Sequence, residues 1–412
     1  MHRIVLLVLL LSLTLPLTAQ ETHPYYGITC ATRDTAVGAF LPASSAFLTG
    51  EAEVKTQFDL VFSDNVPAVA QAAMRFAANV WGTYLDSDVP VRVEIDWEDR
   101  DDERLLASAG PATLFRDFAG GLPNTWYPVA LAEAIAGRDL NATDDADIVV
   151  NANSTANWYF GTDGETPRGS IDLVSVMLHE LGHGLGFLSS VDTINENQLE
   201  IGFGERFIVY DLFLETPSGV PLTDPNLFTN PSEELLTAVI SNDLLFTGPR
   251  ATQENEGNEV RLFSPSTFDV GSSVSHLNEA SYPPGTENAL MTPFLASGEA
   301  VHDPGPVTLG IFSDLGWPLD FSVSTAFAPA AQTPLVVFPN PVRDQLTVRL
   351  PEDLLSGTVL LFDGNGRRVL ARTVAPAATN LVLPTVDLPG GVYHLAIIDG
   401  PVTYGARVLV NR

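Results

Sequence analysis

Residues 179–187 read His-Glu-Leu-Gly-His-Gly-Leu-Gly-Phe, and this stretch decides how the rest of the chain is interpreted. It follows an apolar helical pattern, and four residues span slightly more than one helical turn. His179 and His183 therefore lie on one helix face, about 6 Å apart along the axis. Two imidazoles at this spacing can bind one Zn²⁺. Glu180 lies where it can take a proton from the water that the zinc activates.

The same motif also arises by chance in helices whose histidines contact only solvent or a carboxylate. Here Gly184 and Gly186 break the helix directly after the second histidine, and the chain carries an export signal. These features favour a catalytic metal site over an accidental match.

A catalytic zinc needs a third protein ligand, and the sequence offers several. Position 189 is Ser, so no histidine follows at the short spacing of a compact motif. The chain has seven histidines, and those in the N-terminal segments and the C-terminal region are poor candidates. His276 and His302 remain, and His302 lies in an acidic, proline-rich loop that we expect to be solvated. The carboxylate alternatives are Asp192, Glu196 and Glu200.

The N-terminus has the pattern of a secretory signal peptide. A short basic region precedes an apolar run, and small residues follow it, so residues 1–20 are predicted to be cleaved. A membrane anchor is the alternative, but the run is short for a span of about 20 residues. We expect no membrane span in the mature protein.

The composition excludes several classes of function. The chain has 412 residues, with 51 acidic and 20 basic side chains and a formal net charge of −31. Such a charge argues against binding to nucleic acid or to anionic lipid. The single cysteine excludes an intramolecular disulfide.

The pattern along the chain predicts several domains. Residues 21–52 have no clear period and are predicted to be a pro-segment, with an irregular N-terminal arm as the alternative. Residues 53–320 are predicted to form the main domain. This domain begins with a strand at 57–63, a helix at 68–85 and a strand at 89–97. A further strand at 148–153 is expected to form the upper edge of a substrate cleft, pairing with extended peptide; a plain sheet strand is the alternative.

The C-terminal region has a different pattern. Residues 321–335 are rich in proline and small residues and are predicted to be a linker. Residues 336–412 contain short alternating strands with turn residues between them, including a hairpin turn at 363–366. This pattern is typical of a small antiparallel β-sandwich.

Taken together, the histidine motif, a long insertion, Ser275-His276 and Leu290-Met291-Thr292-Pro293 resemble the leishmanolysin branch of the metzincin zinc peptidases. The resemblance covers roughly residues 57–317. It implies an α+β zincin (metzincin-like) catalytic domain ahead of the sandwich. It also implies that His179, His183 and His276 bind the zinc, that Glu180 is the general base and acid, that Met291 forms a methionine turn and that Gly186 ends the helix. The cysteines of leishmanolysin itself are absent.

A second resemblance lies at the C-terminus. The stretch Phe338-Pro339-Asn340-Pro341, with Gly391-Val392-Tyr393 and a terminal strand at 407–410, is similar to a type IX secretion sorting domain. This implies that the type IX secretion machinery is a partner and that the protein is secreted or held on the cell surface. An ordinary binding sandwich, directed for example at carbohydrate, is the alternative.

The function expected from the sequence is that of a secreted zinc endopeptidase acting on proteins or peptides. One catalytic Zn²⁺ is the predicted cofactor, whereas Ca²⁺ stays open because the sequence does not show its sites. Tyr282, shortly after His276, is a candidate oxyanion stabiliser, with a packing role as the alternative. The alternative function is a non-catalytic surface adhesin with a structural zinc, but such a site has no need for a base at position 180.

The lone cysteine is a candidate zymogen switch. Cys30 lies in the predicted pro-segment, near Arg33 and Asp34. A thiolate on the zinc would fill the open coordination position and keep the enzyme latent. Cys30 with Arg33 and Asp34 thus resembles the pro-segment switch of several zinc peptidase families, and this resemblance implies that Cys30→Ala activates the uncut protein; an inert thiol or an intermolecular link is the alternative.

Overall fold

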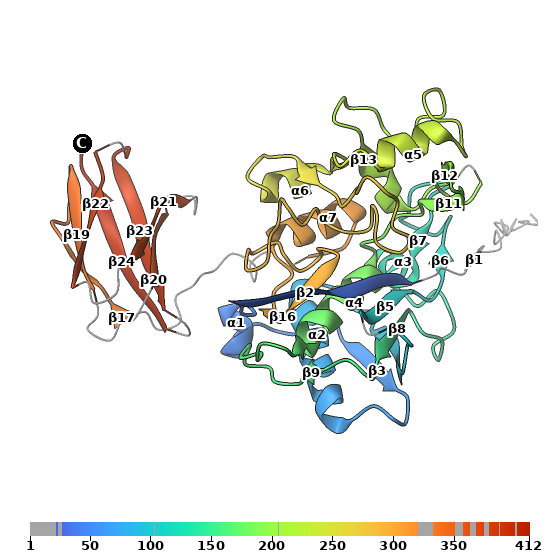
Figure 1. Ribbon diagram of the computed structural model, residues 1–412, viewed down its shortest axis with the longest axis horizontal. Helices are drawn as coiled ribbons and strands as arrows, with labels where there is room; N and C mark the ends of the chain where they lie inside the picture. Colours follow the sequence, from blue (N-terminus) through green and yellow to red (C-terminus); the bar gives the residue numbers. More distant parts are fainter. Residues whose placement is uncertain are drawn as a thin grey trace, which may run out of the picture. The chain divides into compact units, whose positions relative to one another are not determined.

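The computed structural model describes residues 22–23, 27–102, 104–204, 206–319, 333–350, 357–362, 368–374, 379–386, 388–399 and 402–412. It divides into two compact units (Figure 1), one of residues 1–43 and 52–324 and the other of residues 44–51 and 325–412. The predicted signal peptide, most of the predicted linker and the predicted turn at 363–366 lie outside the described residues.

A six-stranded mixed sheet forms the centre of the first unit, in the order β16-β2-β5-β8-β4-β3 (Figure 1). Its strands are β2 (Ile28–Leu41), β3 (Phe58–Phe62), β4 (Val91–Glu98), β5 (Leu105–Pro111), β8 (Ile148–Asn153) and β16 (Phe294–Val301). Strands β3, β4 and β8 are parallel, β5 is antiparallel to both of its neighbours, and β16 is parallel to β2. The sheet thus joins strands from both ends of this unit.

Two helices of this unit pack on each other, and the second of them contains most of the histidine motif. They are α2 (Ala68–Tyr84) and α4 (Leu173–Leu185). Small side chains such as Ala70 and Ala77 let α2 pack closely, and both are fully buried. The indole of Trp81 in α2 donates a hydrogen bond to the carbonyl of Leu178 in α4 at 2.9 Å. This contact fixes the position of the histidine helix.

Shorter elements complete the first unit. Its other helices are α3 (Val129–Ala136), α5 (Glu233–Val239), α6 (Pro249–Glu254), α7 (Pro306–Leu315) and the 3₁₀ helix η1 (Val209–Phe213). Its other strands are β1 (Thr22–His23), β6 (Leu114–Phe115), β7 (Tyr127–Pro128), β9 (Trp158–Tyr159), β10 (Ile171–Asp172), β11 (Asp192–Asn195), β12 (Gln198–Glu200), β13 (Leu214–Glu215), β14 (Leu245–Phe246) and β15 (Val260–Arg261).

The second unit contains two sheets. A five-stranded sheet has the order β17-β24-β23-β20-β21, and a three-stranded sheet has the order β18-β19-β22. Their strands are β17 (Thr333–Pro334), β18 (Val336–Phe338), β19 (Gln345–Arg349), β20 (Gly357–Phe362), β21 (Arg368–Val374), β22 (Asn380–Pro384), β23 (Gly391–Asp399) and β24 (Val402–Val410); the short helix α1 (Ser45–Leu48) is assigned to the same unit. Alternate residues such as Leu346 and Val348 are buried in a shared apolar core.

The fold class expected from the sequence, an α+β zincin-like domain followed by a small sandwich, is wrong. The part of the chain that the structure describes is β-rich, with strands β1 to β24 in seven sheets and helices α1 to α7. Three strands of the main sheet, β2, β5 and β16, come from segments without a strand prediction. The residues of β2 are mostly small and lack a strong alternation, so pairing with neighbouring strands, rather than local propensity, stabilises it.

Candidate metal centre

Helix α4 presents the histidine motif because both of its ends are defined locally. At its N-terminus the carboxylate of Asp172 accepts a hydrogen bond from the backbone N–H of Ser175 at 2.8 Å. At its C-terminus Gly186 has a φ of +127°, which residues with a side chain rarely adopt. The backbone leaves the helix at this residue, and His183 lies in the last turn of α4.

The imidazoles of His179, His183 and His276 converge at one point. The Nε2 atoms of His179 and His183 are 2.9 Å apart, and each lies 3.2 Å from Nε2 of His276. Nitrogen ligands at about 2.0–2.1 Å from a tetrahedral zinc are about 3.3 Å apart. The three nitrogens therefore have nearly the spacing that a single zinc ion requires.

Backbone carbonyls set the tautomer of all three rings. Nδ1 of His179 donates to Leu290 O at 2.7 Å, Nδ1 of His183 donates to Phe187 O at 2.7 Å, and Nδ1 of His276 donates to Ser272 O at 2.8 Å. Because a carbonyl can only accept, each Nδ1 carries the proton and each Nε2 presents a lone pair. Three lone pairs that face one another repel unless a cation lies between them. The donor set thus fits a zinc ion.

Burial keeps these rings neutral. All three histidines are almost fully buried. Burial lowers the pKa of His179 to about 4, and it holds the pKa values of His183 and His276 well below the usual range. Neighbouring histidines lower the last two further. Neutral imidazoles are the form that binds a metal ion.

Glu180 lies beside the cluster and has no polar partner among the described residues. Its side chain is fully buried, and neither carboxylate oxygen has a hydrogen bond there. Burial raises the pKa of this carboxyl well above its usual value. A buried carboxyl group without a partner is costly, so its position next to three nitrogens that could hold a metal ion favours a chemical role.

The other candidate ligands lie elsewhere. His302 was expected in a solvated loop, and this expectation is wrong, because the ring is 1% exposed and its Nε2 lies 2.8 Å from the carboxylate of Asp172. Asp192 and Glu196 are exposed, and Glu200 is half-buried in β12. Among the described residues, the three-histidine group contains His276 and none of these alternatives.

Met291 lies against the histidine helix. Its side chain is fully buried, and its carbonyl accepts a hydrogen bond from Leu277 N at 2.8 Å, next to His276. A Cβ at Gly182, between the two helix histidines, would lie 2.7 Å from the methionine sulfur. Gly182 therefore permits this close approach, a role that the sequence analysis missed.

A strained loop holds His276. Val274 is fully buried and has a φ of +70°, which is rare for a β-branched residue. Its carbonyl accepts a hydrogen bond from the hydroxyl of Tyr210 at 3.1 Å, and the hydroxyl of Ser275 accepts one from Ser189 N at 3.0 Å. No local sequence signal marks Val274, because its conformation depends on partners far along the chain.

Tyr282 and the strand at 148–153 lie in positions that do not match the roles expected for them, which were oxyanion stabilisation and pairing with substrate at the edge of a cleft. Burial raises the pKa of Tyr282 to about 12, and its phenol interacts with the backbone of Arg261 and the side chain of Asn255. No described contact joins it to the three histidines. Strand β8, expected at the edge of a cleft, lies inside the sheet between β4 and β5, so both of its edges are already paired.

Cys30 is brought to the site by strand β2. Its sulfur, one ligand atom of His179 and one carboxylate oxygen of Glu180 all lie within 4.8 Å of one another. The thiol is 2% exposed, and burial, followed by the nearby charge of Glu180, raises its pKa well above the usual value. The structure thus places this N-terminal residue next to the motif helix, although more than a hundred residues separate them in the sequence.

Two family models match parts of the chain. Residues 125–208, which include α4, match the SPBPB7E8-like family, and residues 336–411 match the secretion system C-terminal sorting domain. An uncharacterized protein of Schizosaccharomyces pombe, PB7E8.01, is 39% identical over 62 residues, which is 15% of this chain and 11% of that protein. The match thus spans about a tenth of the relative's length.

A comparison with solved structures gives a partial match. A DUF3244 family protein from Bacteroides vulgatus, with an immunoglobulin-like β-sandwich fold, is 21% identical; the match covers 18% of this chain and 83% of that one, with a TM-score of 0.15.

The sorting domain gives the localisation. Residues 336–411 direct export by type IX secretion to the cell surface or the extracellular space, which confirms the location predicted from the sequence, and the secretion machinery is a partner. Within the described residues, no helix has the length and apolar character needed to cross a bilayer.

Proposed function

We propose that this protein is an exported zinc-dependent endopeptidase. The observation that carries the proposal is the convergence of three Nε2 lone pairs, on His179, His183 and His276, beside the buried carboxylate of Glu180. The resemblance of these motifs to leishmanolysin-type peptidases supports the same assignment. Proteins or peptides are the proposed substrates.

The residues of the site have separate tasks in peptide hydrolysis. The three histidines would hold the zinc through Nε2, and their carbonyl partners keep the rings oriented. Bound zinc supplies Lewis acidity, which polarises the scissile carbonyl and acidifies water. Glu180 would accept the proton of the attacking water and give it to the departing amine. Met291 supports the helix from beneath.

A surface adhesin with a structural zinc is the alternative. Structural zinc sites are closed by four protein ligands. In the described part of the chain, the group at this point contains three histidines, and Cys30 forms a second group with His179 and Glu180. The proposal therefore requires that water or substrate, and not this thiol, takes the fourth position in the active form. No observation favours the adhesin over the peptidase.

The test combines metal analysis with hydrolysis. The N-terminally processed protein should contain about one zinc per chain and should cleave casein or gelatin. Glu180→Gln keeps the shape of the side chain and all three ligands, so it should retain the zinc and lose hydrolysis by about 10²-fold or more. Equal hydrolysis by both proteins, or zinc-free protein that is fully folded and active, would refute the proposal.

A further inference from the structure

Asp211 is a buried carboxylate that lies outside the metal centre and binds the segment directly after α4. It belongs to η1, between α4 and His276 in the sequence, and its side chain is fully buried. The carboxylate accepts hydrogen bonds from the hydroxyls of Ser189 and Ser190 and, at 3.1 Å each, from the backbone N–H groups of Ser190 and Ile208. A buried charge is costly unless donors of this kind satisfy it, so these bonds form a defined connection between η1 and the end of the histidine helix.

The two serine hydroxyls are fixed by further bonds to the backbone. Val191 N donates to Ser189 Oγ at 3.1 Å, and Gly202 N donates to Ser190 Oγ at 2.7 Å. Each hydroxyl therefore accepts from one N–H group and donates its own proton to Asp211. The segment after α4 is thereby held at a fixed place beside η1.

This connection continues to the histidine loop, by which we mean residues 272–277. Ser189 N donates to Ser275 Oγ at 3.0 Å, and the phenol of Tyr210 donates to Val274 O at 3.1 Å. Both Tyr210 and Ser275 are buried, so water does not replace these bonds. Two successive residues of η1 thus hold two successive residues of the loop, Tyr210 directly and Asp211 through Ser189.

The histidine loop needs such support because its backbone is strained. Val274 has a φ of +70°, a conformation that a buried β-branched residue keeps only where its surroundings impose it. When the bonds from η1 are removed, Val274 can relax towards an ordinary φ. We expect the ring of His276, two residues further on, to move with the backbone and to take its Nε2 away from the other two histidines.

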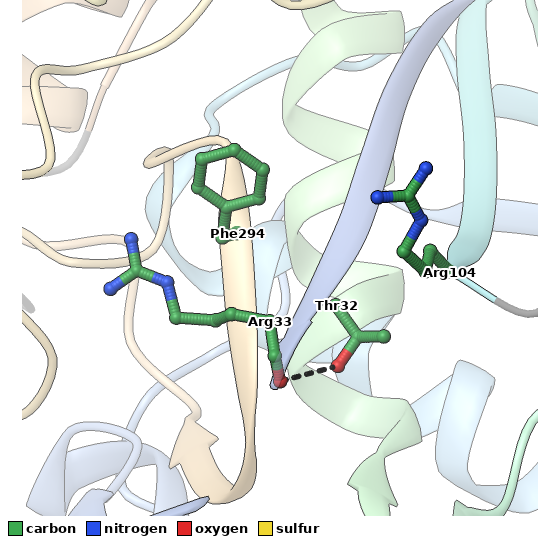
Figure 2. Close-up of a pocket in the computed structure, with 4 residues that line it drawn as sticks. All are labelled: Thr32, Arg33, Arg104 and Phe294. Carbon is green, nitrogen blue, oxygen red and sulfur yellow. Dashed lines mark hydrogen bonds between the residues drawn. The ribbon is translucent and has the colours of Figure 1, made fainter. Parts of the chain in front are cut away.

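The other side of the loop is held by Phe263. Val274 N donates to Phe263 O and Phe263 N donates to His276 O, both at 2.8 Å. The ring of Phe263 lies edge-on to that of Phe294, with centroids 6.0 Å apart. Phe294 lines a pocket, shown in Figure 2, together with Thr32, Arg33 and Arg104. Because a pocket and not a packed core adjoins Phe294, this side of the loop can yield, and we expect the bonds from η1 to fix the loop.

We infer that Asp211 positions the third metal ligand, so that the ring of His276 faces the other two histidines before any metal binds. It acts through Ser189 and Ser275, and Tyr210 acts beside it. Ligands that are already in place bind a metal ion more tightly, because binding then loses no free energy in ordering them. The inference rests on the zinc site of the proposed function and is independent of peptide hydrolysis.

The test compares three substitutions in the full chain with a matched control. Ser275→Ala and Tyr210→Phe each remove one bond between the histidine loop and its support. Asp211→Asn replaces one accepting oxygen by an amide nitrogen, which cannot accept. Ser190→Ala is the control, because its hydroxyl bonds the same carboxylate and one backbone N–H but has no described bond to the histidine loop.

Two quantities separate positioning from simple stabilisation. The zinc dissociation constant of each metal-free protein is measured by competition with a chromophoric chelator, and urea unfolding gives its free energy of unfolding. A side chain that only stabilises the fold changes the free energy of unfolding and leaves the zinc dissociation constant as it was, because the folded protein still presents all three ligands. A positioning residue raises the dissociation constant as well.

Ser275→Ala and Tyr210→Phe should each weaken zinc binding by about tenfold, as expected for residues that orient a metal ligand from outside. Asp211→Asn should weaken it at least as much, and the two milder variants decide the question where this one does not fold. Ser190→Ala should unfold at lower urea and bind zinc like the unsubstituted protein. Unchanged zinc binding in both Ser275→Ala and Tyr210→Phe, or an equal loss in Ser190→Ala, would overturn the inference alone. An unsubstituted protein that binds no zinc would refute the proposed function together with this inference.

Discussion

His302 and His276 offer a matched pair of substitutions, because both are buried histidines near α4 with different partners. His276 belongs to the three-nitrogen cluster, whereas Nε2 of His302 donates to the carboxylate of Asp172 at 2.8 Å. We predict that His302→Ala lowers the free energy of unfolding and leaves zinc binding intact, and that His276→Ala removes the zinc.

The magnitude for His302→Ala follows from its contacts. A hydrogen bond to a charged group contributes about 1.5–3 kcal/mol. The ring also packs edge-on against Phe40 and Phe76, with centroid distances of 5.4 and 5.8 Å, so its removal leaves a cavity beneath these two rings. Asp172 keeps its bond to Ser175 N and continues to cap α4. We therefore expect a loss of about 3 kcal/mol without loss of the helix.

Two measurements on each variant separate the roles. Urea unfolding of the metal-free protein gives the free energy of unfolding, and elemental analysis after dialysis against micromolar zinc gives the zinc content. His302→Ala should contain zinc at the level of the unsubstituted protein, and His276→Ala should contain little. Stoichiometric zinc in His276→Ala, or a zinc-free but fully stable His302→Ala, would show that the ligand assignment is wrong.

Three further changes test other parts of the molecule. Cys30→Ala should leave the protein that retains residues 21–52 inactive toward casein, contrary to the expectation from sequence. The reason is that backbone hydrogen bonds to β5 and to Gly271 hold β2 next to Glu180 without the thiol. Full activity of this uncut variant would show that the thiol itself keeps the protein inactive. Burial raises the pKa of Glu133 to about 7, so the folded protein holds this proton more tightly than the unfolded chain does and loses stability as pH rises from about 4 to 7. Glu133→Gln should raise the urea midpoint at pH 8 and leave it unchanged at pH 4, and equal shifts at both pH values would contradict this reasoning. A chain ending at Asp320 should fold and bind zinc but fail to reach the cell surface, as measured by cell fractionation; surface delivery without residues 336–411 would contradict the role of the sorting domain.

The part of the site that lies on one helix could be predicted from the sequence. Helix geometry alone places His179, Glu180 and His183 together, and Gly186 marks the helix end. His276 was predictable only as one of several candidates, because its approach depends on Val274 and on partners distant in sequence. Local patterns carry no information on such long-range contacts.

The burial of His302 and the formation of strand β2 could not be predicted from the sequence, and each has a physical reason. The neighbours of His302 are acidic and suggested solvent, yet Glu299 is buried, Asp303 is half-buried, and both carboxylates accept hydrogen bonds from backbone N–H groups within the fold. Burial of charged groups depends on partners that composition does not reveal. The residues of β2 show no strong alternation of apolar and polar side chains, and the strand is stabilised by backbone pairing on both edges, which a local sequence pattern does not encode.

The pairing of β2 with β16 also determines when the site can form during synthesis. Ala31 lies opposite Phe294, so the first strand of the main sheet waits for one of the last segments of its domain. Contacts between residues so far apart in sequence form slowly, because a long loop must close first. We therefore expect the pairing of β2 and the approach of His276 to α4 to occur late in folding. A nascent chain contains the histidine helix long before it contains all three residues of the proposed zinc site. Zinc uptake by this protein should then report the completion of folding rather than its start.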